Sequence, residues 1–146
     1  TLKADVIIPT NRSGKVKIDF NITGEWSRDW YDKGVILGRA TQQANGTFIY
    51  DKLIRPAPTS NRGLIISNFM ISYNNNADST LDQVSGVIVD DDQLVSGNTY
   101  RYTPILVNTY PHNNTATFHL NSVIGSQTTT NYERSVSTIT ASLIIV

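Results

Sequence analysis

The chain contains no cysteine, which excludes a disulfide framework, a thiolate nucleophile and any cysteine-ligated metal site. It also lacks an excess of charge of either sign, because Lys plus Arg and Asp plus Glu number 12 each. Nucleic acid and anionic membrane surfaces are therefore poor candidate partners. No apolar run approaches the roughly 18 residues of a membrane-spanning helix. We expect the protein to be stabilised by burial and hydrogen bonds, or by oligomerisation.

Helical periodicity is missing as well. No window repeats apolar residues at i, i+3, i+4 and i+7, and Ala, Glu, Leu and Lys are scarce for a helical protein. Ser, Thr and Asn are abundant, and their side chains compete with helix by bonding their own backbone. The β-branched Thr, Val and Ile suit a pleated surface. The composition therefore predicts an all-β protein.

Short alternating segments separated by turn residues predict the architecture. We expect one domain over residues 1–146, an all-β antiparallel β-sandwich or jelly roll of about 8–10 strands with little or no helix. Residues 1–10 form either an N-terminal arm or the first strand. They lack the basic and apolar regions of a signal peptide, and we expect a complete small protein.

Alternation of apolar and polar residues marks individual strands. Val16, Ile18 and Phe20 share one predicted face, opposite charged neighbours. The segment 64–73, LIISNFMISY, is apolar on both faces, which indicates a central strand or one covered by a neighbouring chain. In the segment 99–107, Pro104 lacks an N–H, so this strand lies at an edge or carries a bulge there.

The two C-terminal segments also alternate. The segment 115–121, TATFHLN, predicts buried Phe118 and Leu120 and an outward His119. The closing segment 135–146 predicts one face made of Ile139, Ala141, Leu143 and Ile145. A chain that ends on an apolar strand must cover it, either within a sandwich or against a neighbouring subunit.

Residues suited to catalysis are few. The only histidines, His112 and His119, lie in a predicted turn and on the polar side of a predicted strand, outside any nucleophile motif. The only glutamates, Glu25 and Glu133, favour salt-bridging or solvated positions over a glycosidase pair. There is no phosphate-binding loop and no dinucleotide fingerprint. We expect a protein that is not an enzyme and needs no cofactor.

Asp90, Asp91 and Asp92 form the one acidic cluster. A solvated turn is the favoured interpretation, with calcium as a weak alternative, because consecutive strand residues point in different directions and converge only at a sharp turn. Four Asn-x-Ser/Thr triplets would matter only in a secreted eukaryotic protein. They begin at Asn11, Asn21, Asn45 and Asn113.

Tyr and Trp outnumber Phe, which is typical of interfaces and sugar-stacking surfaces, although half-buried positions at the sandwich rim are also expected. The stretch 24–34, GEWSRDWYDKG, would bury an arginine between Trp26 and Trp30 in a straight strand. We therefore expect Trp26 to end a strand and point inward, with a turn after it, and Trp30 or Tyr31 to reach a subunit boundary. Tyr73 and Tyr110 lie in amide-rich loops and are further candidates for contact with a partner or glycan.

Two parts of the chain resemble a known group. The segments SGNTYRYTPILVNT (96–109), ATFHLNS (116–122) and NYERSVSTITASLIIV (131–146) resemble the C-terminal half of small β-rich virion proteins of tailed bacteriophages, cyanophages especially. GEWSRDWYDKGVILGRA (24–40) resembles their tryptophan-bearing first-half element. Ser135 stands where that pattern favours Gly, and the chain ends in SLIIV where the pattern has an acidic residue.

This resemblance implies a jelly-roll head similar to tumour-necrosis-factor-like or C1q-like domains, often trimeric. Such heads serve as capsid decoration (cement) proteins or as receptor-binding tips of tail fibres. A short chain favours a decoration protein, assembled in the bacterial cytoplasm, located on the virion, and bound to its own copies and to the major capsid protein or other virion proteins. Two alternatives stay open: a module that binds host surface glycan, and a fimbrial-type adhesin subunit that donates residues 1–10 as a strand.

Overall fold

The computed structural model describes residues 2–26, 33–56, 65–69, 81–108, 118–121 and 136–145. These residues form antiparallel strands and no helix, so the all-β prediction is confirmed. None of the described segments is a helix of the length and apolar character needed to span a membrane. The strands are β1 (Ala4–Ile7), β2 (Gly14–Trp26), β3 (Lys33–Gln42), β4 (Phe48–Ile54), β5 (Ser67–Asn68), β6 (Asp82–Leu94), β7 (Thr99–Asn108), β8 (Phe118–Leu120) and β9 (Thr138–Ile145).

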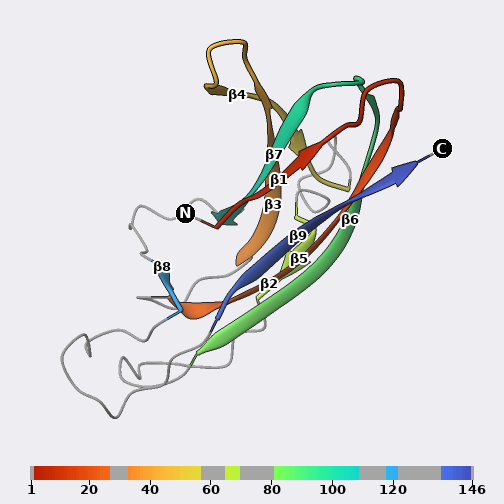
Figure 1. The fold of residues 1–146 in the computed structure, drawn as a ribbon. Helices are drawn as coiled ribbons and strands as arrows, with labels where there is room; N and C mark the ends of the chain where they lie inside the picture. The colour runs from red at the N-terminus through yellow and green to blue at the C-terminus, as the bar shows by residue number, and fades with distance from the viewer. Residues whose placement is uncertain are drawn as a thin grey trace.

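The strands form two sheets that pack as a sandwich (Figure 1). The first sheet has the order β1-β7-β3-β4, and β5 pairs with β3. The second has the order β6-β2-β8, and β9 pairs with β2. Residues 4–7, which we expected as an arm or a first strand, form β1 and pair with β7 of the same chain.

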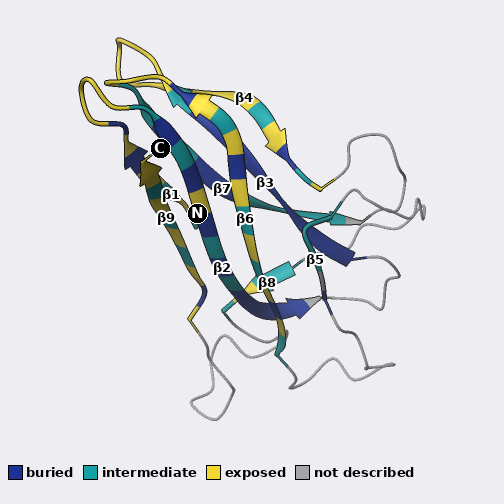
Figure 2. Ribbon diagram, turned by 90° about the vertical axis from the view of Figure 1, so that its right-hand side faces the viewer, coloured by how far each residue is buried: buried dark blue, intermediate teal, exposed yellow. Residues whose placement is uncertain are grey.

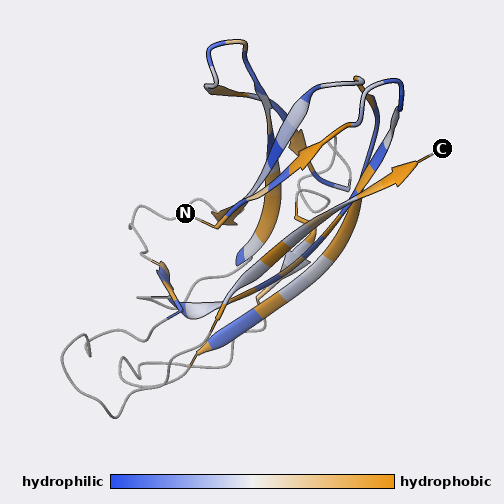
Figure 3. Cartoon of the chain, in the orientation of Figure 1, coloured by the Kyte–Doolittle hydropathy of each residue, from blue (hydrophilic) through white to orange (hydrophobic). Residues whose placement is uncertain are grey.

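The core lies between the sheets and follows the alternation of the sequence. Val16, Ile18 and Phe20 of β2 are buried, as predicted. Val35 and Leu37 of β3 face them from the first sheet and belong to the same core cluster. Long buried stretches run along β2 and β3 (Figure 2), and β3 has a hydrophobic portion between more hydrophilic ones (Figure 3). Full desolvation of such side chains contributes about 1.5–3 kcal/mol each before entropy is subtracted.

Strand β7 shows why a proline is tolerated in the first sheet. Its Tyr100 and Tyr102 point into the core, and Pro104 is paired with Leu37 of β3. The partner on the other side of β7, strand β1, pairs only as far as Tyr102. Pro104 therefore lies where β7 has lost its second described neighbour and is locally an edge, which agrees with the expectation from its missing N–H.

The burial predicted for the C-terminal strands β8 and β9 was only partly right. Leu120, which we expected to be buried, is exposed. On the predicted face of β9, Ile139, Ala141 and Leu143 pack against the core, whereas Ile145 is exposed. Strand β8 is only three residues long, and β9 pairs with β2 alone among the described strands, so both lie where the sandwich is incompletely covered. Within the segment 64–73, residues 65–69 are described, and Ser67–Asn68 form the short strand β5 beside β3.

Candidate functional site

The most densely connected polar group of the described residues lies between the two sheets. We call it the ion cluster, and it consists of Arg39, Asp51, Lys52, Asp90, Asp91 and Asp92. Arg39 of β3 donates from Nε and Nη2 to both carboxylate oxygens of Asp51 on β4, at 3.1 and 3.3 Å. Its Nη1 donates across the sandwich to Asp90 and Asp92 of β6, at 2.9 and 2.8 Å. One guanidinium therefore joins three strands.

Asp90 is the fully buried member of the cluster, with a side chain 0% exposed. It accepts hydrogen bonds from Arg39 Nη1, from Lys52 Nζ at 3.0 Å and from the Tyr102 hydroxyl at 3.0 Å. An unpaired buried carboxylate would cost several kcal/mol, whereas this one has two cations and a hydroxyl as partners. The three side-chain donors therefore give Asp90 a structural role between the sheets.

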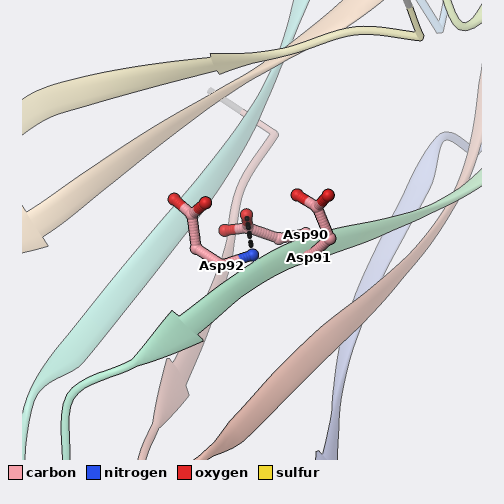
Figure 4. A group of neighbouring side chains, drawn as sticks. All are labelled: Asp90, Asp91 and Asp92. Carbon is pink, nitrogen blue, oxygen red and sulfur yellow. Dashed lines mark hydrogen bonds between the residues drawn. The ribbon is translucent and has the colours of Figure 1, made fainter.

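A β-bulge brings the three consecutive aspartates of β6 together. Gly14 pairs with Leu94 and Val16 with Asp90, so an advance of four residues along β6 matches an advance of two residues along β2. Extra residues in one strand re-aim its side chains, which is what a bulge does. One carboxylate oxygen from each aspartate lies within 4.8 Å of the others (Figure 4). Our expectation of a turn at this position was wrong, because the residues lie inside β6.

A second bulge lies on β4. Arg39 pairs with Lys52 and the next residue, Ala40, pairs with Tyr50, which leaves Asp51 without a partner in the ladder. Its carboxylate turns toward Arg39 and also accepts from the Thr41 hydroxyl at 2.8 Å. Both bulges thus direct carboxylates at the same arginine.

The contacts within the cluster favour the charged forms of Arg39, Lys52 and Asp92. Burial opposes the charges of Arg39 and Lys52, but hydrogen bonds and attraction from the aspartates outweigh it and raise the pKa of both. The hydrogen bond from Lys52, followed by that from Arg39, lowers the pKa of Asp92 against the opposing effect of burial. Burial and the neighbouring Asp90 raise the pKa of Tyr102, so its hydroxyl stays a donor.

The same contacts bear on a metal at Asp90, Asp91 and Asp92. Lys52 Nζ already lies 3.0, 3.5 and 2.8 Å from oxygens of the three residues in order. A calcium ion prefers six to eight oxygen ligands and would meet this ammonium group at the point where the carboxylates converge. The three carboxylates therefore fit the ammonium group of Lys52 better than a calcium ion.

The outer surface of the first sheet is a second candidate site. We call it the apolar face, and its members are Ile7, Phe48, Tyr50, Leu53, Arg101 and Asp5. Tyr50 and Leu53 of β4 are 59% and 50% exposed, and Ile7 of β1 is 68% exposed. Pairing of Tyr50 with Ala40 and of Leu53 with Gly38 places them opposite the core-facing Arg39 and Leu37.

Arg101 of β7 ties the apolar face together. It donates from Nε and Nη2 to both oxygens of Asp5 on β1, at 2.7 and 2.8 Å. Its guanidinium carbon lies 3.6 Å from the centroid of the Phe48 ring on β4. The contact spans β3, where Ala40 leaves room, and it leaves this surface electrically neutral and rich in rings.

The outer surface of the second sheet has a different composition. Lys17 and Asp19 of β2 form an ion pair at 3.1 Å on this side. Thr140 and Ser142 of β9 pair with Asp19 and Lys17 and share their face. Val87 of β6 is exposed among them, opposite Asp19. This surface therefore combines charged and hydroxyl groups with three exposed apolar side chains, Val87, Val89 and Ile144.

The aromatic residues that we proposed as contacts lie mostly outside the described residues. Trp26 ends β2, as expected, but the description covers its backbone alone. Trp30, Tyr31, Tyr73 and Tyr110 fall outside the described ranges. Of the catalytic candidates, Glu25 is buried on β2 and His119 lies on β8, while His112 and Glu133 are not described.

The sequence analysis did not single out Arg39 or Tyr50, although a local sequence pattern indicates the position of each. Arg39 follows Val35 and Leu37 with a spacing of two, so it belongs on the core face, where a lone cation requires an anion. Tyr50 alternates with Phe48 beside the Asn45-Gly46 hairpin, a position for an edge strand with an aromatic side. Neither signal indicates which distant residue is the partner.

Comparison of the chain with protein-family models, with curated proteins and with solved structures finds no match in any of the three.

Proposed function

We propose that this protein is a non-enzymatic structural protein of the virion surface, a capsid decoration protein that self-associates as a trimer and binds the capsid. The observation that carries the self-association is the set of large apolar side chains that stay exposed in the single chain. On the outer side of the first sheet these are Ile7, Tyr50 and Leu53, and on the outer side of the second sheet they are Val87, Val89 and Ile144. Clusters of exposed apolar side chains mark interaction sites.

The ion cluster supports a structural role. Its charged groups are paired with one another, and Arg39 and Lys52 connect the first sheet to Asp90 and Asp92 of the second. A catalytic carboxylate is kept reactive, whereas the carboxylate of Asp90 is buried and already accepts from three donors. The resemblance of residues 24–40 and 96–146 to tailed-phage virion proteins supports a location on the virion surface.

Glycan binding is the competing function, and exposed Tyr50 is the residue that favours it, because sugars stack on such rings. The fimbrial alternative is less well supported. Residues 4–7 already pair with β7 of their own chain, so donation of this strand would first require its removal from the sheet.

The test is to purify the particles made from the genome that encodes this chain and to image them by cryo-electron microscopy. The proposal predicts protein density on the outside of the capsid lattice, grouped in threes, into which this sandwich fits. Mass spectrometry of the same particles would detect the chain in a fixed ratio to the major capsid protein. Absence of the chain from purified particles, or density confined to tail fibres, would contradict the proposal.

A further inference from the structure

We infer that the open edge of β9 binds an extended, uncharged segment of a different protein by β-strand addition. This inference rests on the proposed attachment to a capsid and assigns that attachment to one strand. Among the described strands, β9 pairs with β2 alone, and β2 lies between it and β6 (Figure 2). In an antiparallel strand every second residue directs its N–H and C=O to the same side. The eight residues of β9 therefore present about four donors and about four acceptors at the open edge.

Strand β9 has none of the features that protect the edges at β4 and β6. Those two strands each carry a bulge and an inward-pointing charge, Lys52 on β4 and Asp90 on β6. The pairing of β9 with β2 continues without a shift from Thr138 to Ile145. Its sequence TITASLII contains no charge, glycine or proline. A long, regular and uncharged edge of this kind is a template for another strand.

The core-facing side of β9 is less well covered than that of its neighbour β2. Val16 and Ile18 of β2 are 0% exposed, whereas their partners on β9, Leu143 and Ala141, are only partly buried. Ile145, at the end of the same side, is 56% exposed. A strand added beside β9 would cover these side chains with apolar residues at every second position.

The other side of β9 indicates the remaining positions of the occupant. Thr138, Thr140 and Ser142 are exposed there and offer hydroxyl groups to cross-strand neighbours. Strand β9 provides no charge with which a charged side chain of the occupant could pair. The edge therefore fits a segment of about eight residues in which apolar and small polar residues alternate.

A second copy of this chain offers no suitable strand for this edge among its described residues. Strands β1, β5 and β8 have only four, two and three residues, and the part of β7 beyond β1 contains Pro104, which cannot donate. The edges of β4 and β6 carry the bulges and charges described above. A second β9 matches in length, but its antiparallel pairing is a two-fold contact that closes at two copies. The proposed assembly is a trimer, so the occupant belongs to a different protein.

The first experiment changes only the ligand, so folding of the protein does not enter. The probe is a synthetic peptide with the β9 sequence TITASLII on a soluble fluorescent linker, because it has the expected length and alternation. Two further peptides are N-methylated at alternate residues, one at the odd and one at the even positions. An added strand pairs through one of its edges only. By fluorescence anisotropy, one methylated peptide should bind like the parent and the other at least about 30-fold more weakly.

The second experiment locates the contact on the protein. Thr140→Lys combined with Ser142→Lys places charges along β9, and we expect the affinity for the peptide to fall at least about 10-fold. Ser85→Lys combined with Val87→Lys is the matched control, because both residues are exposed on the outer side of β6 and the affinity should not change. Hydrogen exchange should show alternate amides of β9 exchanging rapidly in the free protein and slowly with the peptide bound.

Several outcomes would overturn the inference. These are no binding of the parent peptide, equal weakening by both methylated peptides, equal loss of affinity in the β6 and β9 variants, and β9 amides that are all protected in the free protein. A wild-type dimer that dissociates in the β9 variant would identify a second copy as the occupant and contradict the assignment to a different protein.

The same variants separate this inference from the proposed function. A β9 variant that still decorates the capsid overturns the assignment to β9 and leaves the proposed function standing. A wild type that binds the peptide at β9 but is absent from purified particles overturns the proposed function, and the edge of β9 remains a site for an extended segment.

Discussion

At the scale of single residues, Asp90 is the position on which the packing of the two sheets most depends. It is a carboxylate in the core whose hydrogen bonds come from β3, β4 and β7 of the opposite sheet. A buried ion pair is not in itself stabilising relative to apolar packing. Removal of one partner is costly, however, because it leaves the remaining charges desolvated and unpaired.

Asp90→Asn is therefore expected to destabilise the protein by about 3–5 kcal/mol, since Arg39 and Lys52 lose their shared buried anion. Asp91→Asn is the matched control, because the side chain of Asp91 is 80% exposed, and it should change stability by no more than about 0.5 kcal/mol. Urea unfolding followed by circular dichroism measures both. Equal effects of the two substitutions would show that burial of the charge is unimportant.

Calcium provides a separate check on the same three aspartates. Because Lys52 occupies the point where their carboxylates converge, we expect millimolar calcium to leave the urea midpoint of the wild type unchanged. Asp91→Asn should behave identically with and without the ion. A calcium-dependent rise of the midpoint that disappears in Asp91→Asn would restore the metal interpretation.

Gly86 is a second sensitive position. It pairs with Phe20 across β6 and β2, and an added Cβ would collide with the ring of Phe20. Gly86→Ala is expected to cost about 1–3 kcal/mol through overpacking. Gly46→Ala, in the open hairpin turn where no atom lies near the added Cβ, should cost less, and only through its positive φ of 82°. Thermal unfolding of the two variants would rank them, and the opposite order would contradict the packing at Phe20.

At the scale of elements, the two sheets meet in two places, at the ion cluster and where β1 lies near β9. Strand β1 of the first sheet lies near β9 of the second, and Arg39 and Lys52 connect β3 and β4 to β6. The two bulges that form the cluster also protect the edges of β4 and β6 from pairing with other chains. One arrangement of charges thus joins the sheets and protects the edges of β4 and β6.

The stabilisation from the ion pair between Lys52 of β4 and Asp92 of β6 should depend on pH. The folded-state pKa of Asp92 is lowered, so its contribution is present above the unfolded value of about 3.9 and is lost as pH falls through the folded value. The pKa of Lys52 is raised, so its contribution is present below about 10.4 and is lost as pH rises toward the folded value.

A double-mutant cycle with Lys52→Met and Asp92→Asn measures this connection directly. The coupling energy should be constant between about pH 5 and pH 9 and should decline below about pH 4. The same cycle on the exposed pair Lys17 and Asp19 gives a control in which the coupling is small throughout. A Lys52–Asp92 coupling that persists undiminished at pH 2 would be incompatible with a paired carboxylate.

The sequence predicted the strands better than it predicted which strands and side chains pair with one another. Alternation in KVKIDF located β2 and its buried face, because the period of two follows directly from strand geometry. The same rule failed at Asp90–Asp92, because a bulge suspends the alternation and depends on the partner strand, β2. Arg39 and Asp90 are 51 residues apart, and nothing local to either residue indicates the other. The predicted aromatic site at Trp30 and Tyr73 stays a prediction.

At the scale of the whole molecule, the protein is a sandwich of two sheets, each with large apolar side chains exposed on its outer side. Tyr50 and Leu53 are exposed on the first sheet, and Val87, Val89 and Ile144 on the second. Self-association is therefore the central claim.

The most direct test is the mass of the wild-type protein in solution, measured by gel filtration with multi-angle light scattering from micromolar to submicromolar concentration. The account predicts a stable species of three times the mass of one chain that persists on dilution. A species with the mass of a single chain at every concentration would contradict it.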